Sequence, residues 1–267
     1  MNREFLVRDD LIININSLTT KNTRGAAGST SFPSALATRT DEYDLYSLSF
    51  MKFFADSNLK VYMNRSTSNQ VYDDPNESFP VFSEHDLDQS SFGVDFAKKI
   101  NTNLDYRVSA KQKVDSISST DLSNQELNST SAIFLLNYTN NEEDFKISPS
   151  TRFDKQSGND KLTYNVSFES VDQFAKGDLS YFDFGLDAGS SFQFPTLNDL
   201  YWPDGLYSSG NPDLKPEESD YFSVNMTNNS VVGKFTVTAT MKDYENLILW
   251  QPNESFKYIP INVSSAS

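Results

Sequence analysis

The chain has 267 residues, a formal net charge of −15 and no cysteine. The acidic balance argues against nucleic acid or an anionic membrane surface as a partner, and the lack of cysteine excludes disulfides and thiol chemistry. Aromatic residues make up 13% of the sequence although its mean hydropathy is −0.53, which fits a sheet that is apolar on one face only.

The sequence contains no run of about 18 apolar residues, so we expect no transmembrane helix. Its first residues, MNREFLVRDD, lack the apolar core of a signal peptide. We therefore expect an internal fragment of a longer protein, in which residues 1–267 form one incomplete domain that is truncated at both ends.

Side chains alternate between apolar and polar along almost the whole chain. Strict alternation over about 6–8 residues predicts half-buried antiparallel strands, and we expect about a dozen of them without a convincing helix in between. The clearest segments are residues 59–64, 92–97, 104–109, 162–169, 182–187, 222–227 and 235–242.

The predicted connections alternate between long and short. Long ones are expected at residues 19–41, 73–86, 192–219 and 245–258, short ones at 56–58, 99–103, 140–144, 173–178 and 228–233, and a medium one at 115–125. The turn at 156–161 is an exception, because it is short where the alternation predicts a long loop. One end of the sheet thus carries loops and the other carries turns, as in outer-membrane β-barrels, whose long loops are extracellular. A soluble β-sandwich or a β-rich surface adhesin also alternates, but a sandwich of this size usually has tight turns at both ends.

The free-energy cost of placing a charge in lipid predicts which face of the sheet contacts lipid and which faces the lumen. A lipid-facing charge at the bilayer midplane costs about 2–4 kcal/mol, so the apolar residues should face outward and the polar ones a wet lumen. We therefore expect the charged strand residues to point inward, among them Arg107, Glu169, Asp183 and Asp187. Aromatic residues near strand ends, such as Tyr43, Tyr106 and Tyr164, fit interfacial girdles or ordinary sheet positions equally well.

The stretch from Phe192 to Ser219 predicts a long, ordered loop between two strands. Pro195 favours extended geometry for the residue before it, and Leu197, Leu200 and Tyr201 have the spacing of one short helical turn. Residues 210–212 have turn chemistry, and residues 215–217 keep the chain extended before the next strand.

Two motifs in this stretch, F-x-x-P-T-x-x-x-L-Y and then G-N-P-x-L-K-P-E, resemble a signature of TonB-dependent outer-membrane receptors, in the branch of vitamin B12 and siderophore transporters. Residues 243–248 and 261–266 are similar to the next hairpin of that family, and residues 28–34 are weakly similar to a loop in some of its members. Most of the chain fits the family, but the specific motifs lie between residues 192 and 266. The signature residues are Phe192, Pro195, Thr196, Leu200, Tyr201, Gly210, Asn211, Pro212, Leu214, Lys215, Pro216 and Glu217.

The resemblance implies an all-β, antiparallel transmembrane β-barrel in the outer membrane of a Gram-negative bacterium. Roughly 12 strands would be about half of a barrel of 22 strands, with the plug domain absent from this chain. The implied function is import of a scarce large solute, a ferric siderophore or cobalamin, without covalent chemistry and therefore without enzyme activity. The implied partners are outer-membrane lipid, a small-molecule or metal-chelate solute, and TonB with its inner-membrane partners, which would contact the missing plug segment.

Aromatic residues in the loops are the candidates for contact with the solute. These are Tyr201, Trp202, Tyr207 and Trp250, for each of which a role in loop packing or in a girdle is an equal alternative. Pro195, Asn211 and Pro216 are expected to be structural and to fix the connection between the strands.

The sequence offers little else for chemistry. It contains no nucleophile elbow, P-loop, dinucleotide fingerprint or His/Cys ligand cluster, and its single histidine, His85, is expected in a solvated connector. Asp73, Asp74 and Glu77 form a weak calcium candidate, for which a solvated turn is the simpler interpretation, and no other cofactor is expected. Two other functions stay open: a β-rich surface binding or adhesion module, and an unplugged porin-type channel.

Overall fold

The computed structural model describes residues 2–26, 34–76, 80–120, 124–142, 144–170 and 180–266. They form thirteen strands and one short helix, α1 (Leu197–Tyr201). The strands are β1 (Asn2–Arg8), β2 (Leu11–Gly25), β3 (Thr38–Phe53), β4 (Ser57–Asp74), β5 (Val81–Lys99), β6 (Leu104–Ser119), β7 (Gln125–Thr139), β8 (Phe145–Gln156), β9 (Asn159–Ser170), β10 (Ser180–Gln193), β11 (Glu217–Ser230), β12 (Gly233–Pro252) and β13 (Tyr258–Ala266).

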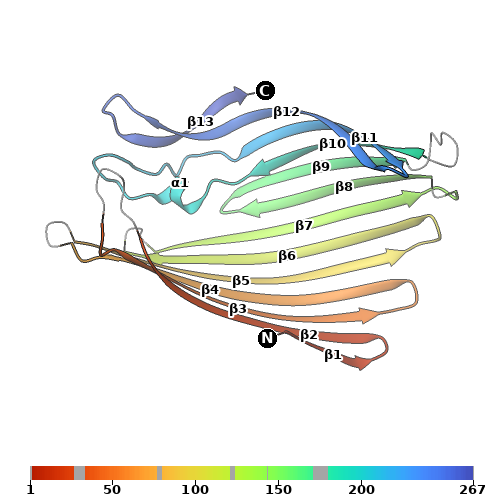
Figure 1. Cartoon of the computed structure of the whole chain (residues 1–267), viewed down its shortest axis with the longest axis horizontal. Helices are drawn as coiled ribbons and strands as arrows, with labels where there is room; N and C mark the ends of the chain where they lie inside the picture. The colour runs from red at the N-terminus through yellow and green to blue at the C-terminus, as the bar shows by residue number, and fades with distance from the viewer. Residues whose placement is uncertain are drawn as a thin grey trace.

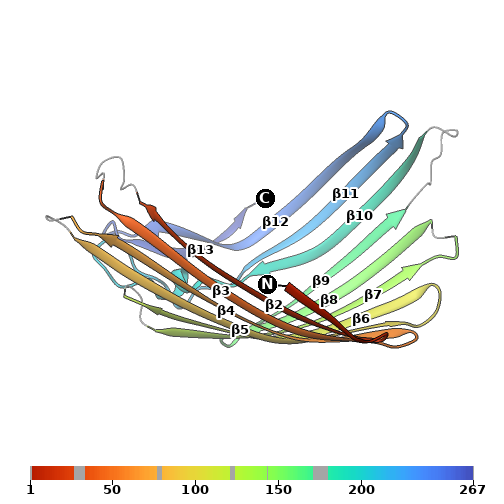
Figure 2. The ribbon, with the colours of Figure 1, turned by 60° about the horizontal axis from the view of Figure 1, so that its bottom comes forward.

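All thirteen strands belong to one sheet, in which each strand pairs with its neighbours in sequence (Figure 1). Every pairing is antiparallel, so β1 and β13 run in the same direction. The sheet curves into a trough with β1 and β13 at its two edges (Figure 2). Among the described residues, no helix has the length and apolar character needed to cross a membrane.

The register separates the side chains into an apolar face and a polar face. On one face Leu186, Val224 and Ala239 lie side by side, whereas on the other Asp187 lies beside Ser223 and Thr240. The two faces continue through every strand pair, because opposed residues of an antiparallel sheet share a face, although towards the loops the apolar face also carries polar residues such as Asp44, Thr67 and Asp88. The prediction that Arg107, Glu169, Asp183 and Asp187 share the polar face is confirmed.

The burial of the side chains is inverted relative to a water-soluble protein. Leu162 on the apolar face is 70% exposed, whereas Asp154 on the concave polar face is only 6% exposed. Apart from glycines and prolines, only three apolar residues are buried in the described part of the chain, Ala37, Leu127 and Leu214. A sheet with so large an exposed apolar face requires an apolar surrounding.

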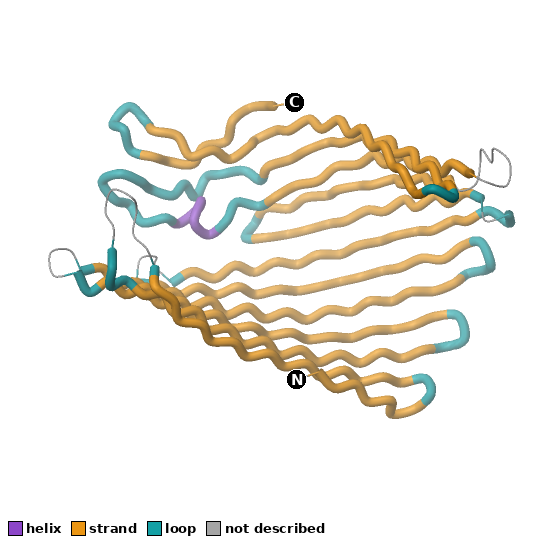
Figure 3. The backbone as a smooth tube through the Cα atoms, viewed as in Figure 1, coloured by secondary structure: helices purple, strands orange, loops and turns teal. Residues whose placement is uncertain are grey.

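The predicted arrangement of connections is confirmed, with loops at one end of the sheet and turns at the other (Figure 3). The short turn predicted at residues 156–161, after β8, is also present. It is a two-residue turn with positive φ at Ser157 and Gly158, the geometry of a tight hairpin. The predicted connection at 173–178 and the weakly similar residues 28–33 lie outside the described residues.

Three of the predicted long loops are too long, because the strands continue beyond their apolar alternation. The 19–41 loop shortens to 26–37, the 73–86 loop to 75–80 and the 245–258 loop to 253–257. Polar side chains bridge neighbouring strands there, as in the hydroxyl pair of Thr23 and Thr40 at 3.0 Å. Backbone ladders need no apolar side chains to continue, so the alternation ends before the strands do.

The prediction for His85 is wrong, and the structure decides between the two alternatives left open for Tyr43. His85 lies within β5 and not in a connector, and its Nδ1 is 2.7 Å from the Ser119 hydroxyl on the polar face. Tyr43 pairs with Ser68 on the polar face, so it is not part of a lipid-side girdle. Tyr106 and Tyr164 lie on the apolar face.

Candidate functional site

The candidate site is built around residues 194–216, the loop between β10 and β11, which we call the signature loop. The predicted helical turn is present as α1 (Figure 3), and Thr196 precedes it as the N-cap residue. The Asp199 backbone N–H donates to the Thr196 hydroxyl at 3.2 Å, and the Thr196 N–H donates to the Asp199 carboxylate at 2.9 Å. This reciprocal capping box fixes the start of the helix. The T-x-x-D spacing that produces it is visible in the sequence, yet Asp199 is not among the predicted signature residues.

Side chains fasten the signature loop to the hairpin of β12 and β13. The amide of Asn211 donates to the Pro260 carbonyl at 3.0 Å, and the Asn211 backbone N–H donates to the Asp199 carbonyl at 2.7 Å. At the loop's exit, the Glu217 carboxylate accepts from the Ile248 N–H at 2.7 Å. Asn211 thus links α1 to β13.

Asn262 on β13 joins the signature loop to two elements at once. Its Oδ1 accepts from the Lys215 N–H at 2.8 Å, and its Nδ2 donates to the Lys215 carbonyl at 3.0 Å and to the Asn246 carbonyl at 2.7 Å. Asn246 has a left-handed φ of 57°, which asparagine tolerates better than most residues. One half-buried amide thus satisfies three backbone groups that lie outside any ladder.

Gly210 is required by the close approach of the chain at the end of α1. A Cβ atom at this position would lie 2.6 Å from the Trp202 backbone nitrogen and 2.8 Å from the Leu200 carbonyl oxygen. The Gly210 N–H uses this proximity to donate to the Trp202 carbonyl at 2.9 Å. Leu214, only 4% exposed, anchors the following turn.

The four predicted solute-contact residues lie in or beside the signature loop, and the two tryptophans are engaged there. Trp250 Nε1 donates to the Asp199 carboxylate at 3.0 Å, and Trp202 Nε1 donates to the Ser208 hydroxyl at 2.8 Å. Their rings meet edge to face with centroids 6.4 Å apart. Tyr201 is half-buried, whereas Tyr207 is 79% exposed and is the most accessible of the four.

The tip of the signature loop carries an ion pair between Asp204 and Lys257. The hydrogen bond from Lys257, its positive charge and the Ser209 hydroxyl hold the pKa of Asp204 below its ordinary value of 3.8. The Asp204 side chain is 81% exposed, so water screens the pair and its contribution to stability is small.

The polar face supplies a lumen lined with charge pairs. Arg39 Nε lies 2.8 Å from Asp41, Lys113 Nζ lies 2.7 Å from Asp115, and Arg152 lies 2.6 Å from the buried carboxylate of Asp154. Such a surface suits contact with water, polar solutes or polar protein segments, and not with lipid.

The calcium candidate does not form a site from its described residues. Asp73 and Asp74 are consecutive at the end of β4, opposite Phe82 and Val81, so their side chains diverge to opposite faces. Glu77 lies outside the described residues. Among the described residues no group of three or more His, Cys, Asp or Glu side chains is arranged to hold a metal ion, and calcium binding stays a prediction.

The sequence of residues 6–267 matches the family model described as TonB dependent receptor-like, beta-barrel. Over 84 residues the chain is 40% identical to the vitamin B12 transporter BtuB of Photobacterium profundum, in an alignment that covers 30% of this chain and 13% of that protein. Over 87 residues it is 36% identical to BtuB of Vibrio vulnificus, with 32% and 14% covered.

Solved structures match over nearly the whole chain. The siderophore receptor PirA from Pseudomonas aeruginosa has a TM-score of 0.80 and 11% identity, covering 99% of this chain and 50% of that structure. The hemophore receptor HasR of Serratia marcescens has a TM-score of 0.76 and 10% identity, covering 98% and 49%. At these identities the likeness shows the fold alone. The chain spans about half the length of these solved structures and a smaller part of its curated relatives.

Proposed function

Because the chain belongs to the TonB-dependent receptor-like β-barrel family, we propose that it forms part of the wall of a transporter that imports a scarce large solute with energy transmitted by TonB. Proteins of this family are located in the outer membrane of Gram-negative bacteria and are not enzymes. The proposed solute class is a cobalamin or a ferric siderophore, and the proposed partners are that solute, TonB and its inner-membrane partners.

The observation that carries the proposal is a curved sheet with one apolar and one polar face. At one end of this sheet, side-chain hydrogen bonds hold the signature loop against β12 and β13. The exposed apolar face suits lipid, and the concave polar face suits a lumen. The topology adds an independent argument. Because β1 and β13 run in the same direction, a closed antiparallel barrel needs an odd number of further strands, and a barrel of about 22 strands exceeds this sheet by nine.

The identity of the transported solute is a more specific part of the proposal. Local identity to vitamin B12 transporters supports a cobalamin, whereas the fold is shared with receptors for siderophores and for a hemophore. Within the signature loop we propose that Tyr207 and the exposed edge of Trp202 contact the solute, since both lie at the loop end and Tyr207 is the most exposed of the candidates.

Uptake measurements in whole cells test this proposal. Cells that express the full reading frame around this chain should accumulate radiolabelled cobalamin or a radiolabelled ferric siderophore only when TonB is present. Replacing Tyr207→Ala should reduce uptake, whereas Tyr164→Ala on the apolar face should not. TonB-independent ion conductance in a planar bilayer would support the porin-type channel instead. Extraction of the protein from cells without detergent would support the adhesion module.

A further inference from the structure

The loop between β12 and β13 holds Phe256 in an unusual backbone conformation. Among the described residues, three that are not glycine have a positive φ: Ser157, Asn246 and Phe256. Serine is small and asparagine tolerates the left-handed region, whereas a bulky side chain at a φ of 61° is a true outlier. Backbone strain of this kind clusters at functional sites.

The turn itself does not require a phenylalanine. The Asn253 side chain accepts from the backbone N–H groups of Ser255 at 2.9 Å and Lys257 at 3.0 Å, and the Asn253 carbonyl accepts from the Phe256 N–H at 2.9 Å. None of these bonds involves the Phe256 side chain. Glycine or asparagine would adopt the same φ with less strain, so the phenylalanine adds no stability to the turn.

Burial does not compensate for this strain, because the Phe256 side chain is 83% exposed. Leu206 and Tyr207, at the tip of the signature loop, are about as exposed. The two loops are joined, since the Tyr258 N–H donates to the Tyr207 carbonyl at 2.8 Å and Lys257 pairs with Asp204. Both loops lie at the loop end of the sheet (Figure 1). We call the three exposed apolar residues, Leu206, Tyr207 and Phe256, the loop-tip patch.

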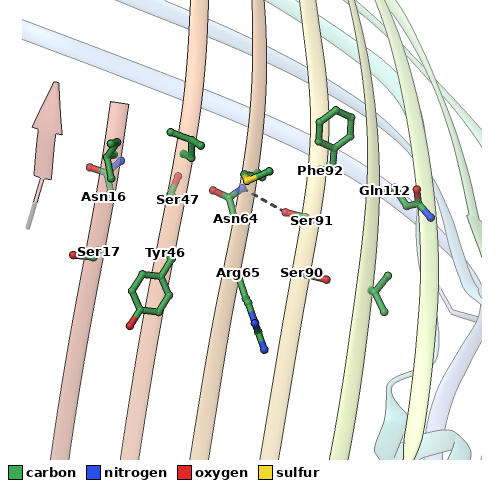
Figure 4. Close-up of a pocket in the computed structure, with 14 residues that line it drawn as sticks. Asn16, Ser17, Tyr46, Ser47, Asn64, Arg65, Ser90, Ser91, Phe92 and Gln112 are labelled. Atoms are coloured by element: carbon green, nitrogen blue, oxygen red, sulfur yellow. Dashed lines mark hydrogen bonds between the residues drawn. The ribbon is translucent and has the colours of Figure 1, made fainter. Parts of the chain in front are cut away.

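The exposure of the loop-tip patch differs from that of the sheet's apolar face. On that face Phe92 borders a groove of about 670 Å³ across β2–β6, where lipid is the expected neighbour of a barrel wall (Figure 4). Along β11 and β12, two rows of opposed carboxylates lie between the apolar band and the loop-tip patch: Asp220 with Asp243, and Glu218 with Glu245. Lipid does not accommodate so many charges, so the patch lies beyond the membrane and meets water unless a ligand covers it.

The charges beside the patch select among ligands. Within residues 202–209 and 253–257 the charged side chains are Asp204, Glu254 and Lys257, and Lys257 is paired with Asp204. These two segments therefore offer no free cation to an anionic metal chelate. Their exposed aromatic rings instead suit stacking against another flat ring system.

We propose that the loop-tip patch binds the solute before it enters the barrel, through a flat and uncharged ring system of that solute. The inference rests on the transport function proposed above and narrows the class of solute. The strain and the lost burial at Phe256 are then offset when its ring stacks on the ligand.

Binding to outer membranes of cells that express the whole protein, and no other receptor for the probes, tests the proposal. The probes are radiolabelled cyanocobalamin, which has an uncharged ring system, and ferric citrate, which is anionic and has no ring. We expect cyanocobalamin to bind and ferric citrate not to bind. Phe256→Ala should weaken cyanocobalamin binding about tenfold, the loss expected for one aromatic contact, and Phe256→Trp should preserve binding. The matched control is Leu36→Ala, which removes another exposed apolar side chain, between β2 and β3, and should leave binding unchanged.

Phe256→Asn separates the ring from the strain, since asparagine removes the ring and relaxes the backbone. Its midpoint of urea unfolding in lipid vesicles should rise above that of the unmodified protein, whereas its cyanocobalamin binding should fall as in Phe256→Ala. A lower midpoint would mean that the ring is packed in the whole protein, and would overturn the proposal.

Failure of this inference and failure of the transport function give different results. Binding of neither probe, or uptake that does not require TonB, would contradict transport and this inference with it. TonB-dependent uptake of cyanocobalamin, together with equal binding by the unmodified protein and Phe256→Ala, would overturn the role of the loop-tip patch alone. Preferential binding of ferric citrate would leave transport in place and overturn the ring-binding site.

Discussion

The sheet from β2 to β7 and the region around β9, β10 and the signature loop are held together in different ways. In the first region the ladders are continuous, as between β4 and β5, which pair from Ser57 and Lys98 to Asp74 and Val81. In the second, β9 and β10 pair only from Ser170 and Phe184 to Asn165 and Gly189. Where that ladder ends, hydrogen bonds and ion pairs of specific side chains take the place of backbone hydrogen bonds.

The end of the β9–β10 ladder shows how this replacement works. Past Gly189 the Tyr164 N–H donates to the Ser190 hydroxyl at 3.2 Å, and Lys161 forms an ion pair with Glu218 on β11. The β8–β9 turn also stops short of the neighbouring hairpins (Figure 3). A regular ladder of backbone hydrogen bonds tolerates any residues that keep the apolar and polar alternation. The side-chain contacts described here require particular residues. Substitutions should therefore be tolerated in the first region and damaging in the second.

Gly210→Ala should be the most damaging of the substitutions considered. The new Cβ would meet backbone atoms of Trp202 and Leu200 that cannot move independently of α1, so we expect a loss of about 2–3 kcal/mol in the free energy of unfolding. Urea unfolding of the protein in lipid vesicles measures this loss. Gly205→Ala in the same loop is the control, because its Cβ would come no closer than 3.6 Å to another residue. Equal stability of the two variants would contradict the packing described for Gly210.

Asn262→Ala should destabilise the protein by about 2 kcal/mol, since it leaves three backbone groups of Lys215 and Asn246 without their partner. The same urea titration applies. Asn262→Asp separates the contributions, because the carboxylate still accepts from Lys215 but no longer donates to either carbonyl. Because the second carboxylate oxygen would face the carbonyls of Lys215 and Asn246, we expect a loss at least as large as that of Asn262→Ala. An Asn262→Asp variant as stable as the unmodified protein would show that the donated bonds are not needed.

Trp250→Phe keeps an aromatic ring beside Trp202 but removes the hydrogen bond to Asp199. We expect a loss of about 1 kcal/mol, the typical value for one such bond. In the background of Asp199→Asn, which weakens the same bond, the additional loss should be much smaller. Additive losses in this double-mutant cycle would mean that Trp250 and Asp199 act independently.

The Asp204–Lys257 pair should give the smallest effect, and one that depends on pH. Because the pKa of Asp204 is lowered in the folded loop, its stabilising contribution is present above the ordinary value of 3.8 and is lost as the pH falls through the lowered pKa. Trp202 fluorescence, recorded in a Trp250→Phe background, should therefore change in acid below pH 3.8. Asp204→Asn should remove this change, and a change that persists would assign it to another group.

The alternation of residues such as Leu186, Asp187 and Gly185 was sufficient to predict the strands, their two faces and the order of loops and turns. The alternation did not locate the ends of the strands, since polar pairs such as Thr23 and Thr40 continue the ladder where no apolar residues alternate. The spacing of Leu197, Leu200 and Tyr201 predicted α1, and the motif marked the signature loop, but the partners on β12 and β13 depend on contacts between distant segments.

The assignment of the two faces is tested most directly by cysteine labelling in intact outer membranes, since residues 1–267 contain no native cysteine. Single variants on the polar face, Asp187→Cys and Ser223→Cys, should react with a small water-soluble maleimide. Their apolar neighbours, Leu186→Cys and Val224→Cys, should react only after the membrane is dissolved and the protein unfolded. Reaction of both sets in the native membrane, or of the apolar set alone, would contradict a wall with lipid on one face and a wet lumen on the other.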